Sequence, residues 1–204
     1  MSPKRVDEQA ILDAAAEEFA EKGFSGARVD EIAKRAGINK AMLYYRVGDK
    51  EELYRRVVLR GQQGFQNAIM EAIESTNTAP DTVASILKGI TENAAENRLM
   101  PSIILREIAG NAKTLPEEGR EGLNRFMNTI RSMVTMGIEE GTFRNIDPTA
   151  LQFMVTGAIF TLSLTSEMRR ELNSDNPGPV TPDQITESIR DILLHGILKN
   201  GDEK

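Results

Sequence analysis

The sequence predicts an all-α protein: an N-terminal three-helix helix-turn-helix domain joined to a C-terminal helical bundle. Apolar residues recur at spacings of three and four along most of the chain, whereas the alternation typical of strands is almost absent. Gly, Pro and capping residues divide the chain into nine segments of helical length. The predicted helices cover residues 7–23, 29–36, 40–46, 49–75, 81–97, 101–113, 117–140, 147–171 and 181–199.

The first three helices end and begin at clear signals. Gly23 ends the first helix and Gly37 ends the second, because a tight turn after a helix favours a residue that accepts a positive φ. Ile38 follows as an apolar plug, and Asn39 is a candidate N-cap for the third helix. Two short helices joined by so tight a turn are typical of a helix-turn-helix.

Later boundaries carry similar signals. Asp49 and Glu52 form a D-x-x-E capping pattern at the start of the fourth helix. Asp147 precedes Pro148, which pairs an N-cap with a proline suited to the first helical position. The segment 181–184, with the pattern T-x-x-Q, predicts the start of the last helix.

Composition excludes several classes of protein. The 204 residues contain no Cys and one His, which excludes disulfides and thiolate metal sites and argues against a His-based metal site or catalytic triad. No nucleophile–base pair, metal cluster or phosphate-binding loop is recognisable, so we expect no enzyme activity and no cofactor. The N-terminus has no apolar segment of the signal-peptide kind, and the longest uncharged apolar-rich run, 150–165, is 16 residues, short of a membrane span. We therefore expect a cytoplasmic protein.

The charge is unevenly distributed along the chain. The net charge is −6, yet residues 1–60 hold 12 basic and 11 acidic side chains, against 13 and 20 in residues 61–204. Residues 25–50 hold six basic and three acidic side chains. A local basic surface on an acidic protein suits a short, specific contact with double-stranded DNA.

The third helix provides the side chains for such a contact. Leu43 is expected to face the core, which leaves the other positions exposed. Lys and Arg bind guanine edges or phosphates, Ala and Met contact thymine methyls, and Tyr hydroxyls reach phosphates. Lys50 adds a charge and helix N-terminal amides for another phosphate. The candidate DNA-binding residues are Arg28, Lys40, Ala41, Met42, Tyr44, Tyr45, Arg46 and Lys50.

Residues 8–55 resemble the tetracycline-repressor (TetR) family of bacterial transcription regulators. The matching segments are 11–15, 19–24, 29–38, Lys40, 43–45 and 50–54. The resemblance implies a helix-turn-helix DNA-binding domain over residues 1–48, with its motif at about 28–47, and a ligand-binding and dimerisation domain over 49–204.

Three positions depart from the family pattern. Arg28 stands where Thr or Ser is usual and loses a capping hydroxyl, Arg46 stands where His is common, and Val47 replaces a larger Phe. We expect these positions to alter the contacts with DNA.

The resemblance also implies a homodimer through the last two helices. The sequence supports it, since the predicted helix 147–171 is apolar on most sides and needs more than one partner surface. A two-fold dimer predicts a palindromic operator.

A ligand cavity within the C-terminal domain is a further implication of the resemblance. The candidate lining residues are Phe65, Ile69, Ile86, Ile90, Ile104, Leu105, Phe126, Ile130, Met133 and Phe153. The sequence thus favours a repressor that leaves its operator when a small, largely apolar effector binds. An activator of the same fold, an all-α sensor without DNA binding, and a helix-turn-helix used for protein contact remain alternatives.

Overall fold

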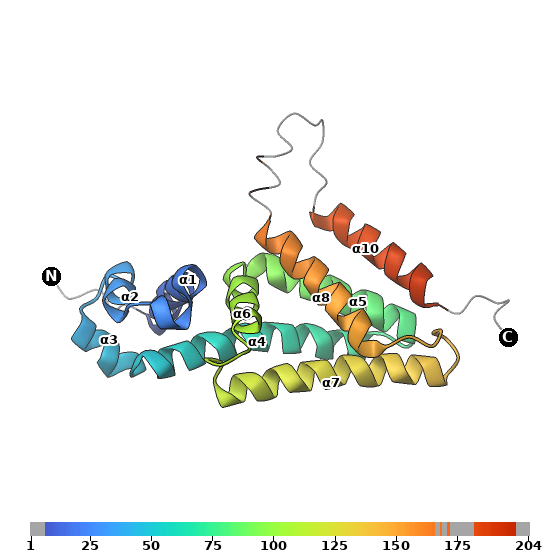
Figure 1. Ribbon diagram of the computed structural model, residues 1–204, viewed down its shortest axis with the longest axis horizontal. Coiled ribbons are helices and arrows are strands. Elements are labelled where there is room, and N and C mark those ends of the chain that lie inside the picture. Colours follow the sequence, from blue (N-terminus) through green and yellow to red (C-terminus); the bar gives the residue numbers. More distant parts are fainter. Residues whose placement is uncertain (1–6, 166–167, 169–170, 172–181, 199–204) are drawn as a thin grey trace. The chain divides into compact units, whose positions relative to one another are not determined.

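A computed structural model describes residues 7–165, 168, 171 and 182–198. The described residues form nine helices and no strand beyond one isolated bridge, which confirms the all-α prediction (Figure 1). The helices are α1 (Glu8–Gly26), α2 (Val29–Arg35), α3 (Lys40–Val47), α4 (Lys50–Ser75), α5 (Ala79–Glu96), α6 (Leu99–Ala109), α7 (Glu117–Glu139), α8 (Pro148–Leu164) and α10 (Pro182–Ile197). No helix among the described residues is both long and apolar enough to cross a membrane.

Several helix ends differ from the prediction for local reasons. α5 begins at Ala79 because Thr78 caps it, accepting from the backbone N–H of Asp81. α6 ends at Ala109 rather than near residue 113, since Asn111 and Ala112 adopt φ angles of 56° and 52°. This left-handed backbone cannot continue an α-helix. α8 ends at Leu164 rather than near residue 171. The predicted cap at residue 181 lies outside the described residues.

The chain packs as two units. One consists of Met1–Gln63 with Leu99–Gly122, and the other of Gly64–Arg98 with Leu123–Lys204. The residues of α4 and α7 are therefore divided between the units. The first unit includes α6, which packs against α1, so the two units do not follow the predicted domain boundary at residue 48. That division stays a prediction about where the DNA-binding segment ends.

Packing in the first unit surrounds the helix-turn-helix. α1 packs against α2, α3 and α6. Phe19, Ile32 and Leu43 are completely or almost completely buried among these helices. Gly23 has a φ of 67° and breaks the helical backbone where the sequence predicts the end of the first helix, although α1 continues beyond this kink to Gly26. Burial of these side chains at helical spacing is the main force that holds the short helices α2 and α3 in place.

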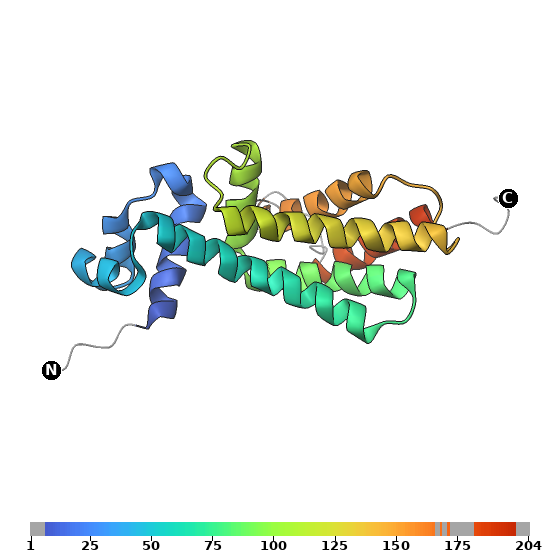
Figure 2. The same ribbon diagram turned by 90° about the horizontal axis from the view of Figure 1, so that it is seen from below.

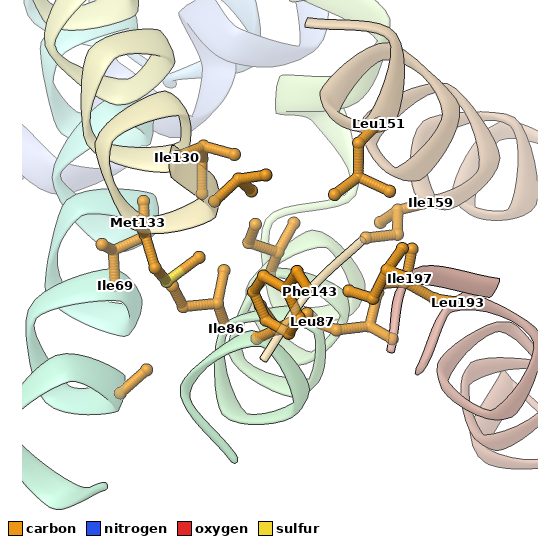
Figure 3. Packing of buried hydrophobic residues seen from close by; sticks show 14 of the residues in the cluster. Ile69, Ile86, Leu87, Ile130, Met133, Phe143, Leu151, Ile159, Leu193 and Ile197 are labelled. Carbon is orange, nitrogen blue, oxygen red and sulfur yellow. The ribbon is translucent and has the colours of Figure 1, made fainter. Parts of the chain in front are cut away.

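The second unit is a helical bundle. Figure 2 shows the end of α4 turning back into α5, and α5 packs in turn against α8 and α10. Its core is a continuous apolar cluster with contributions from all five helices, as Figure 3 shows for Ile69 of α4, Leu87 of α5, Ile130 of α7, Leu151 of α8 and Leu193 of α10.

Candidate nucleic-acid interface

The turn between α2 and α3 is held by specific backbone and side-chain contacts. Gly37 adopts a φ of 68°, the left-handed conformation expected of it. The backbone N–H of Ile38 donates to the Ala33 carbonyl at 3.0 Å and closes the turn. Asn39 caps α3 as predicted, because its Oδ1 accepts from the backbone N–H of Met42 at 2.8 Å. The direction of α3 is thus fixed before any DNA is bound.

The two faces of α3 differ sharply. Leu43 and Val47 are buried, and Val47 provides the smaller plug beneath the helix. On the opposite side Ala41, Tyr44 and Tyr45 are exposed, with 90% of the Tyr45 surface accessible. Met42 and Arg46 are half-buried along the edges of this face. An exposed face on a helix anchored by its other side is the arrangement that a recognition helix needs.

Lys40 and Arg28 lie at the start of the two helices. Lys40 Nζ forms an ion pair with Asp30 Oδ1 at 2.9 Å; this hydrogen bond raises the pKa of Lys40 and lowers the pKa of Asp30. The Arg28 side chain is exposed and makes no cap for α2, which confirms the loss of the capping hydroxyl. Its backbone N–H donates instead to the buried Glu18 carboxylate at 3.2 Å.

Glu18 belongs to an ion-pair network between α1 and α2. The Arg35 guanidinium lies 3.2 Å from Glu17, 3.2 Å from Glu18 and 2.8 Å from Glu21. The hydrogen bond to Glu21 is the largest cause of the raised pKa of Arg35. Three carboxylates around one guanidinium hold α2 against α1, and so fix the base on which α3 stands.

The start of α4 also belongs to this surface. Asp49 Oδ1 accepts from the backbone N–H of Glu52 at 2.8 Å, which confirms the predicted cap. The Glu52 carboxylate pairs instead with Arg55 at 2.7 Å and Arg56 at 2.8 Å, and these two guanidinium groups lower the pKa of Glu52 to about 2. Lys50 Nζ lies 4.9 Å from the centroid of the Phe24 ring, a cation–π contact that holds the side chain near the surface of α1.

An apolar cavity of about 40 Å³ lies inside the second unit, among α5, α7, α8 and α10. Its lining includes five of the ten predicted ligand-binding residues: Ile86, Ile90, Phe126, Ile130 and Met133. Figure 3 labels three of them, Ile86, Ile130 and Met133. The lining also includes six apolar residues that the sequence reasoning missed: Val83, Leu87, Val134, Leu151, Val155 and Leu193. Two polar side chains, Gln152 and Thr156, face it, and nothing in the apolar pattern could have identified them.

The other five predicted ligand-binding residues lie outside this lining. Ile69 is buried in the neighbouring core, and Phe65 packs edge-on against Phe160 with 6.0 Å between the ring centroids. Ile104 and Leu105 lie on α6, which belongs to the first unit. Phe153 is 59% exposed, because on a helix that is apolar all round hydrophobicity does not identify the inward face.

Comparison with known proteins identifies the helix-turn-helix. Residues 11–57 match the family described as "Bacterial regulatory proteins, tetR family". The helix-turn-helix of this chain is that of the tetR family. The chain is therefore a DNA-binding transcription regulator, and the matched residues run from α1 into the first turns of α4. The roles of individual residues in that contact remain predictions.

Relatives within the family extend the match beyond the helix-turn-helix. The "Fatty acid metabolism regulator protein" of Bacillus subtilis is 25% identical over 160 residues, covering 78% of this chain and 82% of its own. The "HTH-type transcriptional regulator RutR" of Escherichia coli is 24% identical over 190 residues, covering 93% and 89%. The ketosteroid transcriptional regulator KstR2 of Mycobacterium tuberculosis has the same fold, with a TM-score of 0.78, 21% identity and coverage of 96% and 98%.

Proposed function

We propose that this regulator is a cytoplasmic repressor that binds a palindromic operator as a homodimer and dissociates when a small, largely apolar ligand enters the second unit. The observation that carries the proposal is the anchored α3, with Leu43 and Val47 buried and Tyr45 exposed. Such a helix presents Lys40, Tyr45 and Arg46 to base edges and phosphates in a major groove.

Exposed apolar residues support the dimer. Phe153 and Met154 on α8 and Ile192 on α10 are 59%, 69% and 72% exposed in the single chain. Large apolar side chains on the surface of neighbouring helices are typical of an interface that a second copy covers. A symmetric dimer carries two recognition helices, and two half-sites supply the affinity that one small domain lacks.

The cavity supports the ligand step. Its volume of about 40 Å³ is far below the roughly 300–1,000 Å³ of pockets that hold small molecules, so a ligand must displace side chains as it enters. The ligand can shift the equilibrium between the DNA-binding and the released conformation only by the difference between its affinities for these two conformations. The name of the Bacillus subtilis relative, a fatty acid metabolism regulator, supports an apolar chain as part of the ligand.

A random-site selection followed by gel shift tests the DNA step. We expect a palindromic sequence to be selected, and we expect the double substitution Lys40→Ala with Tyr45→Ala to abolish binding while the dimer persists in size-exclusion chromatography. Lys34→Ala is the matched control, because Lys34 is a largely exposed lysine on α2 rather than on α3. Selection of no palindrome, or full affinity in the double variant, would refute the proposal. Transcription in vitro from the selected site distinguishes repression from activation.

A further inference from the structure

A second hollow in the same unit lies next to the apolar cavity. It is an open groove of about 960 Å³, lined by the end of α4, the connector to α5, the first turn of α5 and one face of α7. Met133 lines both the groove and the cavity. Its side chain extends from α7 toward Ile69 of α4 and Ile86 of α5 (Figure 3). Met133 therefore lies between the groove, whose lining mixes polar and apolar side chains, and the apolar cavity.

The hydroxyl groups of the connector offer acceptors rather than donors. Thr78 Oγ1 donates to Asp81 Oδ2 at 2.6 Å. Thr76 Oγ1 lies 2.6 Å from the Ala72 carbonyl and 2.7 Å from Thr82 Oγ1, which itself lies 2.9 Å from the Thr78 carbonyl. Each hydroxyl hydrogen thus has an acceptor within the connector or the adjoining helix ends. The oxygen lone pairs that remain can accept hydrogen bonds from a bound molecule.

The α7 side of the groove adds a further acceptor, and Asn128 and Ser132 there, like Asn77 in the connector, bring neutral hydrogen-bond donors to the lining as well. Thr129 Oγ1 donates to the Arg125 carbonyl at 3.0 Å, so its hydrogen is also occupied. Glu140 is the acidic residue of the lining, and the lining contains no Lys, Arg or His among the described residues. A carboxylate or phosphate bound here would face Glu140 without a cation to balance it.

We propose that the groove and the cavity together bind one long-chain amphiphile, whose head group donates hydrogen bonds and carries no negative charge, as in an alkylamine or a long-chain alcohol. The head group binds the threonine oxygens and Glu140, and the tail passes Met133 into the apolar cavity. This inference rests on the proposed function, because it names the chemical class of the effector of the same bundle.

Met133 controls entry of the tail. It is only 7% exposed, and the cavity behind it has room for no more than a few water molecules. An unbranched thioether side chain has several accessible rotamers and rearranges more readily than Ile or Leu. Binding therefore requires Met133 to change rotamer, and a bulky ring at this position would oppose it.

A tryptophan reporter in the groove tests the proposal directly. The chain contains no Trp, so Met136→Trp, at a 50% exposed position in the groove, provides a single tryptophan emission signal. Met70→Trp is the control, at a 54% exposed position on α4 outside the groove lining. We expect decylamine and decan-1-ol, below their micellar concentrations, to change the emission of Met136→Trp saturably and to leave Met70→Trp unchanged. Decanoate should bind at least about tenfold more weakly, the loss of roughly one hydrogen bond to a charged group.

Two further variants distinguish the contribution of the head group to binding from that of the tail. Glu140→Gln should weaken decylamine but not decan-1-ol, and Met133→Phe should weaken both. Decan-1-ol is tested beside decylamine because a protein of net charge −6 attracts any amine, whereas the uncharged alcohol reports on binding without that attraction. Ligand-induced shifts in the melting temperature of the wild-type protein provide the same ranking without a reporter.

Two outcomes would overturn the proposal. One is decanoate binding as tightly as the alcohol. The other is a thermal shift of the wild-type protein with no accompanying change in the emission of the Met136→Trp variant, because the ligand would then bind outside the groove. If the protein selects a palindrome yet binds no amphiphile, only this inference fails and the proposed DNA-binding function stands.

Discussion

The ion pair between α2 and α3 predicts that one acidic residue restrains DNA binding. Lys40 Nζ is held 2.9 Å from Asp30 Oδ1, so the free protein carries a neutralised lysine at the start of its proposed recognition helix. A phosphate that binds Lys40 must compete with Asp30 and approach an anion. We therefore expect Asp30→Asn to increase affinity for DNA.

The magnitude follows from counterion release. Each phosphate that a lysine neutralises contributes about 0.9 to the dependence of log K on log salt concentration. Freeing Lys40 in both protomers should steepen this dependence by up to about 1.8, twice the contribution of one lysine. Because the Debye length is about 10 Å at 0.1 M salt, the gain in affinity should be largest at low salt and should shrink as salt rises.

Fluorescence anisotropy with a labelled operator, repeated from low to high salt, measures both quantities. Glu31→Gln is the matched control, since Glu31 lies on the same helix, carries the same charge and is 3.8 Å from Lys34 rather than near Lys40. Equal gains from the two variants would mean that net charge alone is responsible. An effect of Asp30→Asn that persists undiminished in a Lys40→Met background would also refute the reasoning, because the double-mutant cycle would then show no coupling between the two residues.

Three further changes test the packing that positions the interface. Tyr54→Phe removes a 2.6 Å hydrogen bond to the buried Glu107 carboxylate and should lower the free energy of unfolding by about 1–3 kcal/mol in denaturant titrations, whereas Tyr45→Phe at the surface should leave it unchanged. Since Arg pairing lowers the pKa of Glu52 from 4.5 to about 2, its stabilisation is complete above pH 4.5 and lost as the pH falls toward 2. The melting-temperature difference between wild type and Glu52→Gln should therefore vanish over that range, and a constant difference would contradict the assignment. Asn39→Ala removes the α3 cap, which should cost about 1 kcal/mol of stability and weaken operator binding in a gel shift.

The helix-turn-helix could be predicted closely because its signals are local. Gly37 and Asn39 determine the turn through their own backbone and capping preferences, and the structure shows both. Leu43 is inward for the simple reason that it has the right helical spacing from the neighbouring apolar positions. What the sequence could not indicate is the partner of each charge: the pairing of Lys40 with Asp30 depends on the angle between two helices.

The bundle was less predictable for a physical reason. α8 is apolar on nearly all faces, so its pattern could not distinguish the exposed Phe153 from Leu151, which lines the cavity. Ile104 and Leu105 have the same apolar character as the cavity residues, and only tertiary packing assigns their helix to the first unit. The prediction of α6 extended too far because nothing in the local sequence indicates that Asn111 and Ala112 adopt a positive φ.

Fold and effector chemistry are encoded by different residues in this chain. The helical pattern that matches relatives at 21–25% identity specifies buried faces, and many apolar sequences satisfy it. The proposed head-group site is built instead from the α4–α5 connector and the exposed face of α7, where substitutions cost little stability. A fatty acid carboxylate bound there would face the anionic Glu140, and the described lining contains no Lys, Arg or His to balance the two charges. The relative affinities for decylamine, decan-1-ol and decanoate therefore distinguish two effectors. One is a fatty acid, as in the name of the Bacillus subtilis relative, and the other is the amphiphile without negative charge that we propose for the groove of this protein.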